Sequence, residues 1–221
     1  MSLERDGFVL VERVVDVATI AHLRTVFMDA AMARSERDGE TYGARNLLGV
    51  SAVRDVLPVL REIVGGDLAA VRGLFFDKTE AANWPVPWHQ DLTLALAGRC
   101  EMRGWSNWSI KRGVHHAQPP AGLLARMVTL RLHLDDCGAD NGPLRIVAGS
   151  HAHGILPRDE IRARTASQTV VTARAGDALV MRPLILHASS PATRPGHRRV
   201  LHVEFAPPDL LPSGLVWAEA A

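Results

Sequence analysis

"MVTLRLHLDDC", residues 127–137, alternates apolar and polar side chains and ends in an acidic turn. A period of two predicts a strand with Thr129, Arg131 and His133 on one face and leucines on the other. Similar patterns, bounded by Gly, Pro, Asn or Asp, predict further strands at 7–15, 69–78, 88–96, 142–151, 169–182 and 198–206.

Helical patterns are confined to the first third of the chain. Apolar spacing predicts helices at 16–35 and 51–65; in the second, Ser51 is a plausible N-cap, Pro58 a possible break and Gly65 a stop. Helices followed by many short strands indicate a mainly β, α+β protein with a jelly-roll or cupin-like double sheet.

We expect one domain over 1–221. In this interpretation, 1–66 supplies an N-terminal strand and helices, and 67–210 forms the jelly-roll core. The segment 98–126 has no clear pattern, so it is expected to be an inserted loop over the barrel mouth, with room for a short helix.

Composition narrows the function classes. The 221 residues include 25 Lys+Arg and 24 Asp+Glu, so no broad basic face for nucleic acid or an anionic membrane is implied. Cys100 and Cys137 lie far apart without a CxxC motif, which argues against a disulfide framework or a thiolate zinc site. Without a signal-peptide pattern or a run of 18 apolar residues, we expect a cytoplasmic protein with a small-molecule substrate. The oligomeric state stays open.

A second stretch carries chemistry. "PVPWHQDLTLAL", residues 85–96, places His89 and Asp91 two positions apart in an apolar run. An imidazole with a carboxylate suits Fe(II), although an isolated HxD often occurs by chance. His187 in "PLILHASSP" ends an apolar strand 98 residues after His89 and is the best candidate for a third ligand. Two histidines and one carboxylate form the facial triad of non-haem iron oxygenases, which leaves positions for a 2-oxo acid and O2.

A basic residue fits the same chemistry. Arg198 lies 11 residues beyond His187 on the next predicted strand. A guanidinium suits the distal carboxylate of 2-oxoglutarate. Alternation allows only one of Arg198 and Arg199 to point inward, and the pattern does not choose between them.

At this point the sequence resembles the phytanoyl-CoA dioxygenase family of Fe(II)- and 2-oxoglutarate-dependent oxygenases. The resemblance is carried by Arg198 and by "RDGFVLVERVVD" (5–16), "WHQD" (88–91), "LDDCGADNGPLRIVAGSH" (134–151) and "AGDALVMRPLILHAS" (175–189). It implies a double-stranded β-helix and an enzyme that uses Fe(II), 2-oxoglutarate and O2 to hydroxylate a small molecule, with release of succinate and CO2.

The resemblance also implies site residues. It makes His89, Asp91 and His187 the iron ligands and favours Arg198 over Arg199 as the co-substrate anchor. Gln90 and Ser189 match family positions near the co-substrate. Arg131 falls where the family often has an inward, aromatic residue, and Thr129 shares its strand face. A further departure is Ala192, where the family often has asparagine.

Substrate residues are less specified. Lys78 could reach substrate or co-substrate, and is equally well explained as a solvated lysine. A wall or lid for an apolar or planar substrate could be formed by Trp84, Trp88, Trp105 and Trp108, which could equally pack at the rim. Arg103, Lys111 and Arg112 hint at an acidic substrate, but charged loops are usually only solvated.

Two other readings stay open at this level. A cupin-like hydrolase or isomerase could use the same ligands for zinc or manganese, and a jelly-roll binding module would need no catalysis. The first gives Arg198 no evident purpose, and the second would not need three convergent ligands in an apolar setting.

Overall fold

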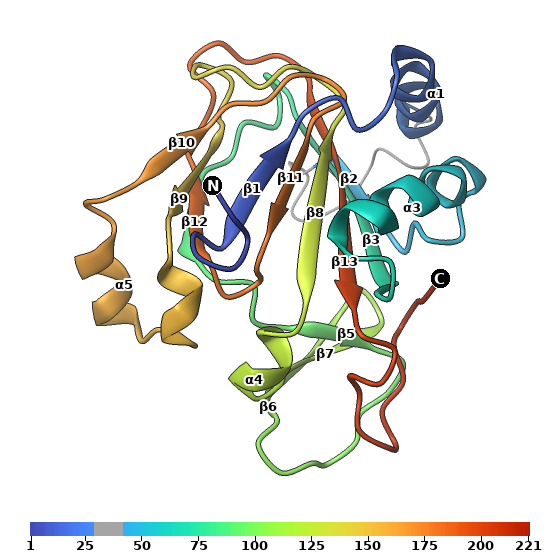
Figure 1. Cartoon of the computed structure of the whole chain (residues 1–221), viewed down its shortest axis with the longest axis vertical. Helices are drawn as coiled ribbons and strands as arrows, with labels where there is room; N and C mark the ends of the chain where they lie inside the picture. Colours follow the sequence, from blue (N-terminus) through green and yellow to red (C-terminus); the bar gives the residue numbers. More distant parts are fainter. Residues whose placement is uncertain (29–41) are drawn as a thin grey trace.

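The computed structural model describes residues 1–28 and 42–221. Its main layer is an antiparallel six-stranded sheet, ordered β1 (Phe8–Val11), β11 (Ala178–Met181), β8 (Val128–His133), β13 (Arg198–Ala206), β3 (Ala69–Lys78) and β2 (Tyr42–Arg45). A four-stranded sheet has the order β10 (Thr169–Val171), β9 (Leu144–Val147), β12 (Leu186–Ser189) and β4 (Val86–His89). Figure 1 shows the two sheets, and the predicted jelly-roll class is confirmed.

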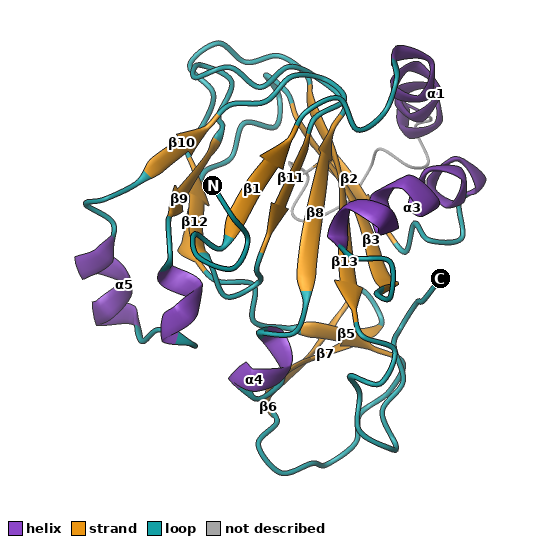
Figure 2. Cartoon of the chain, viewed as in Figure 1, coloured by secondary structure: helices purple, strands orange, loops and turns teal. Residues whose placement is uncertain are grey.

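The segment 98–126 is more ordered than its sequence predicted. It contains β6 (Ser106–Lys111), β7 (Val114–Gln118) and α4 (Ala121–Leu124), and β5 (Leu94–Leu96) joins them in a third sheet at the bottom of Figure 2. Arg112 and Gly113 have φ angles of 53° and 77°, as a two-residue hairpin turn of the primed type requires. The expected loop is therefore mainly a hairpin.

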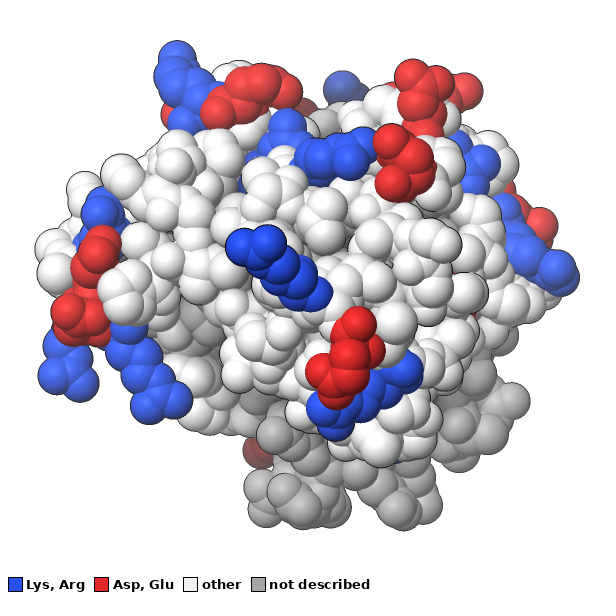
Figure 3. Space-filling model, turned by 90° about the horizontal axis from the view of Figure 1, so that it is seen from below, with Lys and Arg blue, Asp and Glu red and all other residues white. Residues whose placement is uncertain are grey.

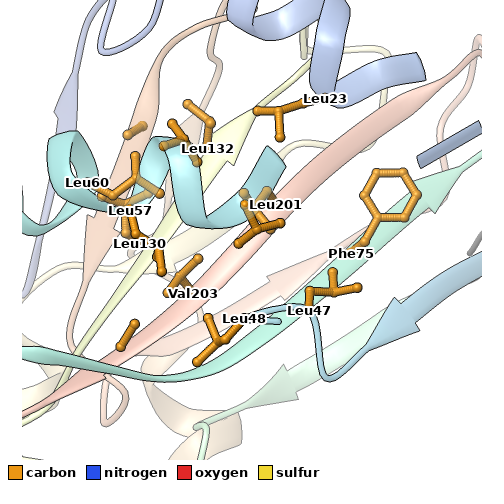
Figure 4. Packing of buried hydrophobic residues seen from close by; sticks show 14 of the residues in the cluster. Leu23, Leu47, Leu48, Leu57, Leu60, Phe75, Leu130, Leu132, Leu201 and Val203 are labelled. Carbon is orange, nitrogen blue, oxygen red and sulfur yellow. The ribbon is translucent and has the colours of Figure 1, made fainter. Parts of the chain in front are cut away.

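Helices cover the outer face of the six-stranded sheet. α1 (Val17–Met28) and α3 (Ser51–Val64) lie beside it in Figure 1, while α5 (Arg158–Arg164) and a 3-10 turn (Ser150–His153) lie near the four-stranded sheet. Figure 4 shows the leucines of α3 against the sheet's leucines and Val203. Burying each such side chain contributes about 1.5–3 kcal/mol, so this layer anchors the sheet.

Two local expectations for α3 need correction. Pro58 lies inside the helix and does not break it, because it occupies an exposed position where the freed carbonyl can meet water. Val50 is the N-cap, without a side-chain hydrogen bond, and Ser51 is the first helical residue. Gly65 ends the helix as predicted, with a φ of 104°. The part of the predicted first helix at 29–35 lies outside the described residues.

The six-stranded sheet has two contrasting faces. Leu130 and Leu132 of β8 pack in the helix-covered core, whereas Arg131, next to them in sequence, lines a cavity. On β13, Leu201 likewise packs outward and His202 lines the cavity. Burying charged groups is costly unless they are paired or bind something, so this polar inner face marks a site.

No helix among the described residues has the length and apolarity needed to cross a bilayer. On the face seen in Figure 3, basic and acidic side chains are interspersed.

Candidate active site

The cavity is centred on three side chains from neighbouring elements. His89 of β4 and His187 of β12 are direct cross-strand partners, with ring centroids 4.2 Å apart. Just after β4, the Asp91 N–H donates to the carbonyl of Pro183, at 2.9 Å. Asp91 Oδ1 lies 3.5 Å from His89 Nε2, and Oδ2 lies 3.7 Å from His187 Nε2. One donor atom from each of the three residues lies within 4.8 Å of the others.

Backbone carbonyls fix which ring nitrogen of each histidine is available. His89 Nδ1 lies 2.8 Å from the Pro87 carbonyl, and His187 Nδ1 lies 3.0 Å from the Ile185 carbonyl. Because a carbonyl only accepts hydrogen bonds, each Nδ1 carries the hydrogen. The Nε2 lone pairs are left facing Asp91, which is the arrangement that a metal-binding histidine needs.

The protonation states of His187 and Asp91 suit a metal. Burial lowers the pKa of His89, but the hydrogen bond and charge of Asp91 outweigh it and raise that pKa, so a bound metal would displace this proton. Burial lowers the pKa of His187 to about 4, despite the opposing charge of Asp91. Burial opposes ionisation of Asp91, but the nearby His187 and His89 outweigh it and hold its pKa below the usual range. At neutral pH, His187 is a neutral imidazole and Asp91 a carboxylate, which are the forms that bind metal.

A cavity of about 320 Å³ surrounds these groups. Its described lining comes from both large sheets and from the turn of the β6–β7 hairpin: Arg45, Arg72, Leu74, Phe76, Trp84, Val86, His89, Asp91, Arg112, Arg131, Leu144, His187, Ser189, Arg198, His202 and Glu204. Apolar walls with a few convergent polar groups are typical of small-molecule sites.

Arg198 lines one end of the cavity, and its cross-strand partner Lys78 on β3 is buried beside it, outside the cavity lining. The Arg198 guanidinium donates to the Gly142 carbonyl, and its buried Nε has no partner among the described residues. Lys78 Nζ donates to Ser189 Oγ at 2.8 Å and to the Ser190 carbonyl at 3.1 Å. Burial and the charge of Arg198 lower the pKa of Lys78 to about 7. An anion bound here would offset the charge of Arg198 and favour the charged form of Lys78.

Arg199 points to the other face of the sheet. Its Nε and Nη2 each donate to Asp135 at 2.7 Å, and Arg24 lies 2.9 Å from the same carboxylate. Of the two adjacent arginines, Arg198 is the one that lines the cavity.

The middle of the cavity holds Arg131. Its Nη1 lies 3.0 Å from His202 Nδ1, and its guanidinium lies 5.7 Å from the centre of the Phe76 ring. His133 is buried on the same strand face, where burial and the charges of Arg131 and Arg198 lower its pKa to about 3. His133 is therefore a neutral imidazole that feels the charges of both arginines.

Besides Lys78, four of the predicted site residues lie outside the cavity lining. The Gln90 amide donates to the carbonyls of Gly154 and Leu184 and accepts from Leu156 N–H, so it braces the backbone outside the cavity lining. Trp88 stacks with Arg145, and Trp105 packs in the core beneath the β6–β7 hairpin.

Thr129 pairs with Glu204, at the opposite end of β13 from Arg198. Its buried Oγ1 has no hydrogen-bond partner among the described residues.

The sequence interpretation also missed cavity residues. Arg72, Leu74, Phe76 and Trp84 line it but were not predicted as site residues, apart from Trp84 in a possible lid. Alternation along 69–78 places Arg72, Leu74, Phe76 and Lys78 on one face, so the pattern already contained this signal.

Comparison with known proteins gives a consistent result. The family model for phytanoyl-CoA dioxygenase matches residues 3–200. Solved structures with similar folds include AviO1 from Streptomyces viridochromogenes Tue57, at TM-score 0.63 and 26% identity, covering 95% of this chain and 94% of that one. HygX from Streptomyces hygroscopicus, solved with nickel and 2-oxoglutarate bound, has a TM-score of 0.66 at 16% identity, with coverage of 99% and 94%.

The carbocyclase SnoK from nogalamycin biosynthesis has a TM-score of 0.67 at 14% identity, covering 92% of this chain and 81% of its own. Comparison with curated protein sequences gives no match. The chain belongs to the phytanoyl-CoA dioxygenase family of non-haem Fe(II)- and 2-oxoglutarate-dependent oxygenases.

Proposed function

We propose that His89, Asp91 and His187 hold the Fe(II) of this dioxygenase. The observation that carries the assignment is the convergence of two Nε2 atoms and a carboxylate within 4.8 Å, with both Nδ1 atoms engaged by backbone carbonyls. Two imidazoles and one carboxylate are the donor set that non-haem Fe(II) takes in such enzymes.

We further propose that Arg198, Lys78 and Ser189 bind the distal carboxylate of 2-oxoglutarate. The buried Arg198 Nε lacks a partner among the described residues, so an incoming carboxylate would satisfy it. Such a carboxylate would also separate the charges of Arg198 and Lys78. Together, Fe(II), 2-oxoglutarate and O2 supply an oxidation of substrate that releases succinate and CO2. The protein's own task is to orient both organic molecules and exclude water.

Hydroxylation of a small-molecule C–H bond is the outcome proposed here. This outcome requires the fewest protein groups, because the protein has only to hold one C–H bond beside the metal. No second residue has to donate a hydrogen atom to the substrate. The apolar side chains of Leu74, Phe76 and Trp84 offer a wall for the substrate body. We propose a cytoplasmic location, which the free thiols of Cys100 and Cys137 suit, and one oxygenase domain over 1–221.

Anaerobic titration tests the metal assignment. Adding Fe(II) and 2-oxoglutarate to the intact protein should produce the weak visible charge-transfer band of their chelate. His187→Ala should lose the band and 2-oxoglutarate-dependent succinate release. His153→Ala, which removes an exposed histidine outside the cavity lining, should retain both. Equal bands in the wild type and His187→Ala would contradict the assignment.

A product test addresses hydroxylation separately. Once a substrate is known, labelled O2 should place one labelled oxygen atom in the product. A product that gains no oxygen while succinate forms would instead indicate ring closure, epimerisation or another oxidation.

A further inference from the structure

The cavity has a second basic end, remote from Arg198. Arg198 and Glu204 are six positions apart on β13, which corresponds to roughly 20 Å of strand. Glu204 pairs with Arg72 of β3, whereas Arg198 pairs with Lys78. The carboxylates of 2-oxoglutarate are separated by three carbon atoms, so one co-substrate molecule bound at Arg198 cannot reach Arg72.

Arg72 is held in place at this second end. Its Nη1 donates to Glu204 Oε1 at 3.0 Å, and its Nη2 lies 3.2 Å from His116 Nε2. His116 Nδ1 lies 3.0 Å from the Val114 carbonyl, so its Nε2 is the acceptor for Arg72. A guanidinium carries five N–H donors, and these contacts use two of them. The remaining N–H donors of Arg72 are carried by a guanidinium that these contacts hold in place on the cavity wall.

Two further arginines line the cavity, one on the strand next to β3 and one on the hairpin that carries His116. Arg45 of β2 pairs with Leu74, two positions from Arg72, and Arg112 comes in from the turn of the β6–β7 hairpin. Burial and the charges of Arg72, Lys111 and Arg45 lower the pKa of His116, which places these groups in one basic neighbourhood.

Arginines outnumber carboxylates among the described lining residues. With Arg45 left out of the count, four arginines face two carboxylates, Asp91 and Glu204, a formal excess of two positive charges within that set. Glu219 also interacts electrostatically with Arg72, but it lies outside the lining and accepts from Gly73 and Leu48 N–H at 2.6 and 3.1 Å. Fe(II) and a doubly ionised 2-oxoglutarate add charges that cancel, so the excess remains when both are bound.

We propose that the substrate carries an oxyanion, a carboxylate or a phosphate ester, and that Arg45, Arg72 and Arg112 bind it. Guanidinium groups match both oxyanions through paired N–H donors. Leu74, two positions from Arg72 on β3, and Phe76 beyond it line the wall next to this oxyanion site and suit an apolar substrate body. This inference rests on the proposed function, because it assigns the other end of the cavity to 2-oxoglutarate.

Binding to the intact protein loaded with Ni(II) and saturating 2-oxoglutarate tests the proposal. The probes are phenylacetate, phenyl phosphate, inorganic phosphate and the neutral phenylacetamide, titrated by calorimetry. At least one anion should bind, and phenylacetamide should bind at least tenfold more weakly. The anion that binds most tightly then shows whether the site prefers a carboxylate or a phosphate.

Matched charge reversals locate the site. Arg112→Glu should weaken anion binding by about tenfold or more, since a charge-assisted hydrogen bond contributes about 1.5–3 kcal/mol. Arg103→Glu carries the same charge change at an exposed position outside the cavity lining and should have no effect.

Three results would overturn the proposal: no anion binds, the amide binds as well as the acids, or Arg112→Glu and Arg103→Glu behave alike. Failure of Ni(II) and 2-oxoglutarate to bind in the same samples would instead overturn the proposed function.

Discussion

Exchanging two adjacent arginines for methionine separates co-substrate binding from folding. Arg198 lines the cavity, whereas Arg199 lies on the opposite face of β13 and is paired with Asp135. Methionine keeps much of the length of arginine and removes its charge and its donors. Arg198→Met and Arg199→Met therefore make the same chemical change on opposite faces of one strand.

The two variants should differ in magnitude as well as in kind. Arg198→Met removes the charge-assisted hydrogen bond that the unpartnered Nε would donate to the proposed carboxylate, while Lys78 remains. The loss is about 2–3 kcal/mol, or roughly 30- to 150-fold in the Kd of 2-oxoglutarate. Its free energy of unfolding should change by less than about 1 kcal/mol, because removing Arg198 also relieves its repulsion with Lys78 and Arg131.

Arg199→Met takes two donors from the buried Asp135, which keeps Arg24 and a backbone N–H. The free energy of unfolding should fall by about 2–3 kcal/mol, which lowers the Tm by roughly 5–10 °C. Calorimetric titration of 2-oxoglutarate and chemical denaturation measure both effects. Unchanged co-substrate affinity in Arg198→Met, or equal loss in both variants, would refute the assignment of the inward face.

Three further predictions concern the same site. The pKa of Lys78 is lowered to about 7 in the folded protein, so the unfolded state holds more protons between pH 7 and about 10.5 and the free energy of unfolding should rise with pH across that window. Lys78→Met should flatten this rise in denaturation curves; an unchanged slope would contradict the lowered pKa. Gly142→Ala should cost about 1–3 kcal/mol and weaken 2-oxoglutarate binding, because Gly142 has a φ of 61° and a Cβ would lie 2.8 Å from the Ser190 carbonyl oxygen. Gly113→Ala has a similar φ with open space around it and is the control, so equal losses in both would argue against the close contact. Finally, Ni(II) at 100 times its Kd should stabilise the wild type by about 2.7 kcal/mol, reversibly with EDTA, and should leave the Tm of His187→Ala unchanged.

Much of the fold was predictable because its strands alternate strongly. The pattern at 69–78 and 198–206 gave the bounds of β3 and β13 as the structure has them. Alternation also separated Arg198 from Arg199. Deciding which of the two arginines faces the cavity needed either a family resemblance or coordinates. A period of two says which residues share a face of a strand, but not which face lines the site.

Position along a strand was harder to predict than face. Thr129 and Arg131 share a face, yet Thr129 lies beside Glu204 and Arg131 beside His202, because cross-strand register decides which end each residue reaches. Gln90 lies between two cavity residues in a bend, so its side chain turns to backbone groups instead.

Some elements gave little periodic signal. α5 buries no residue, so it has no apolar stripe; its signals are Asp159 and Glu160 in the first turn and arginines in the last. The β6–β7 hairpin turns on Arg112-Gly113, which is a weaker turn signal than Asn-Gly.

The most direct test of the central claim is a crystal structure of the anaerobic complex with Fe(II) and 2-oxoglutarate. We predict one iron atom bound by His89 Nε2, His187 Nε2 and the Asp91 carboxylate, with the distal carboxylate of 2-oxoglutarate against Arg198 and Lys78. Iron bound by other side chains, or a distal carboxylate held at Arg72 instead, would contradict the account.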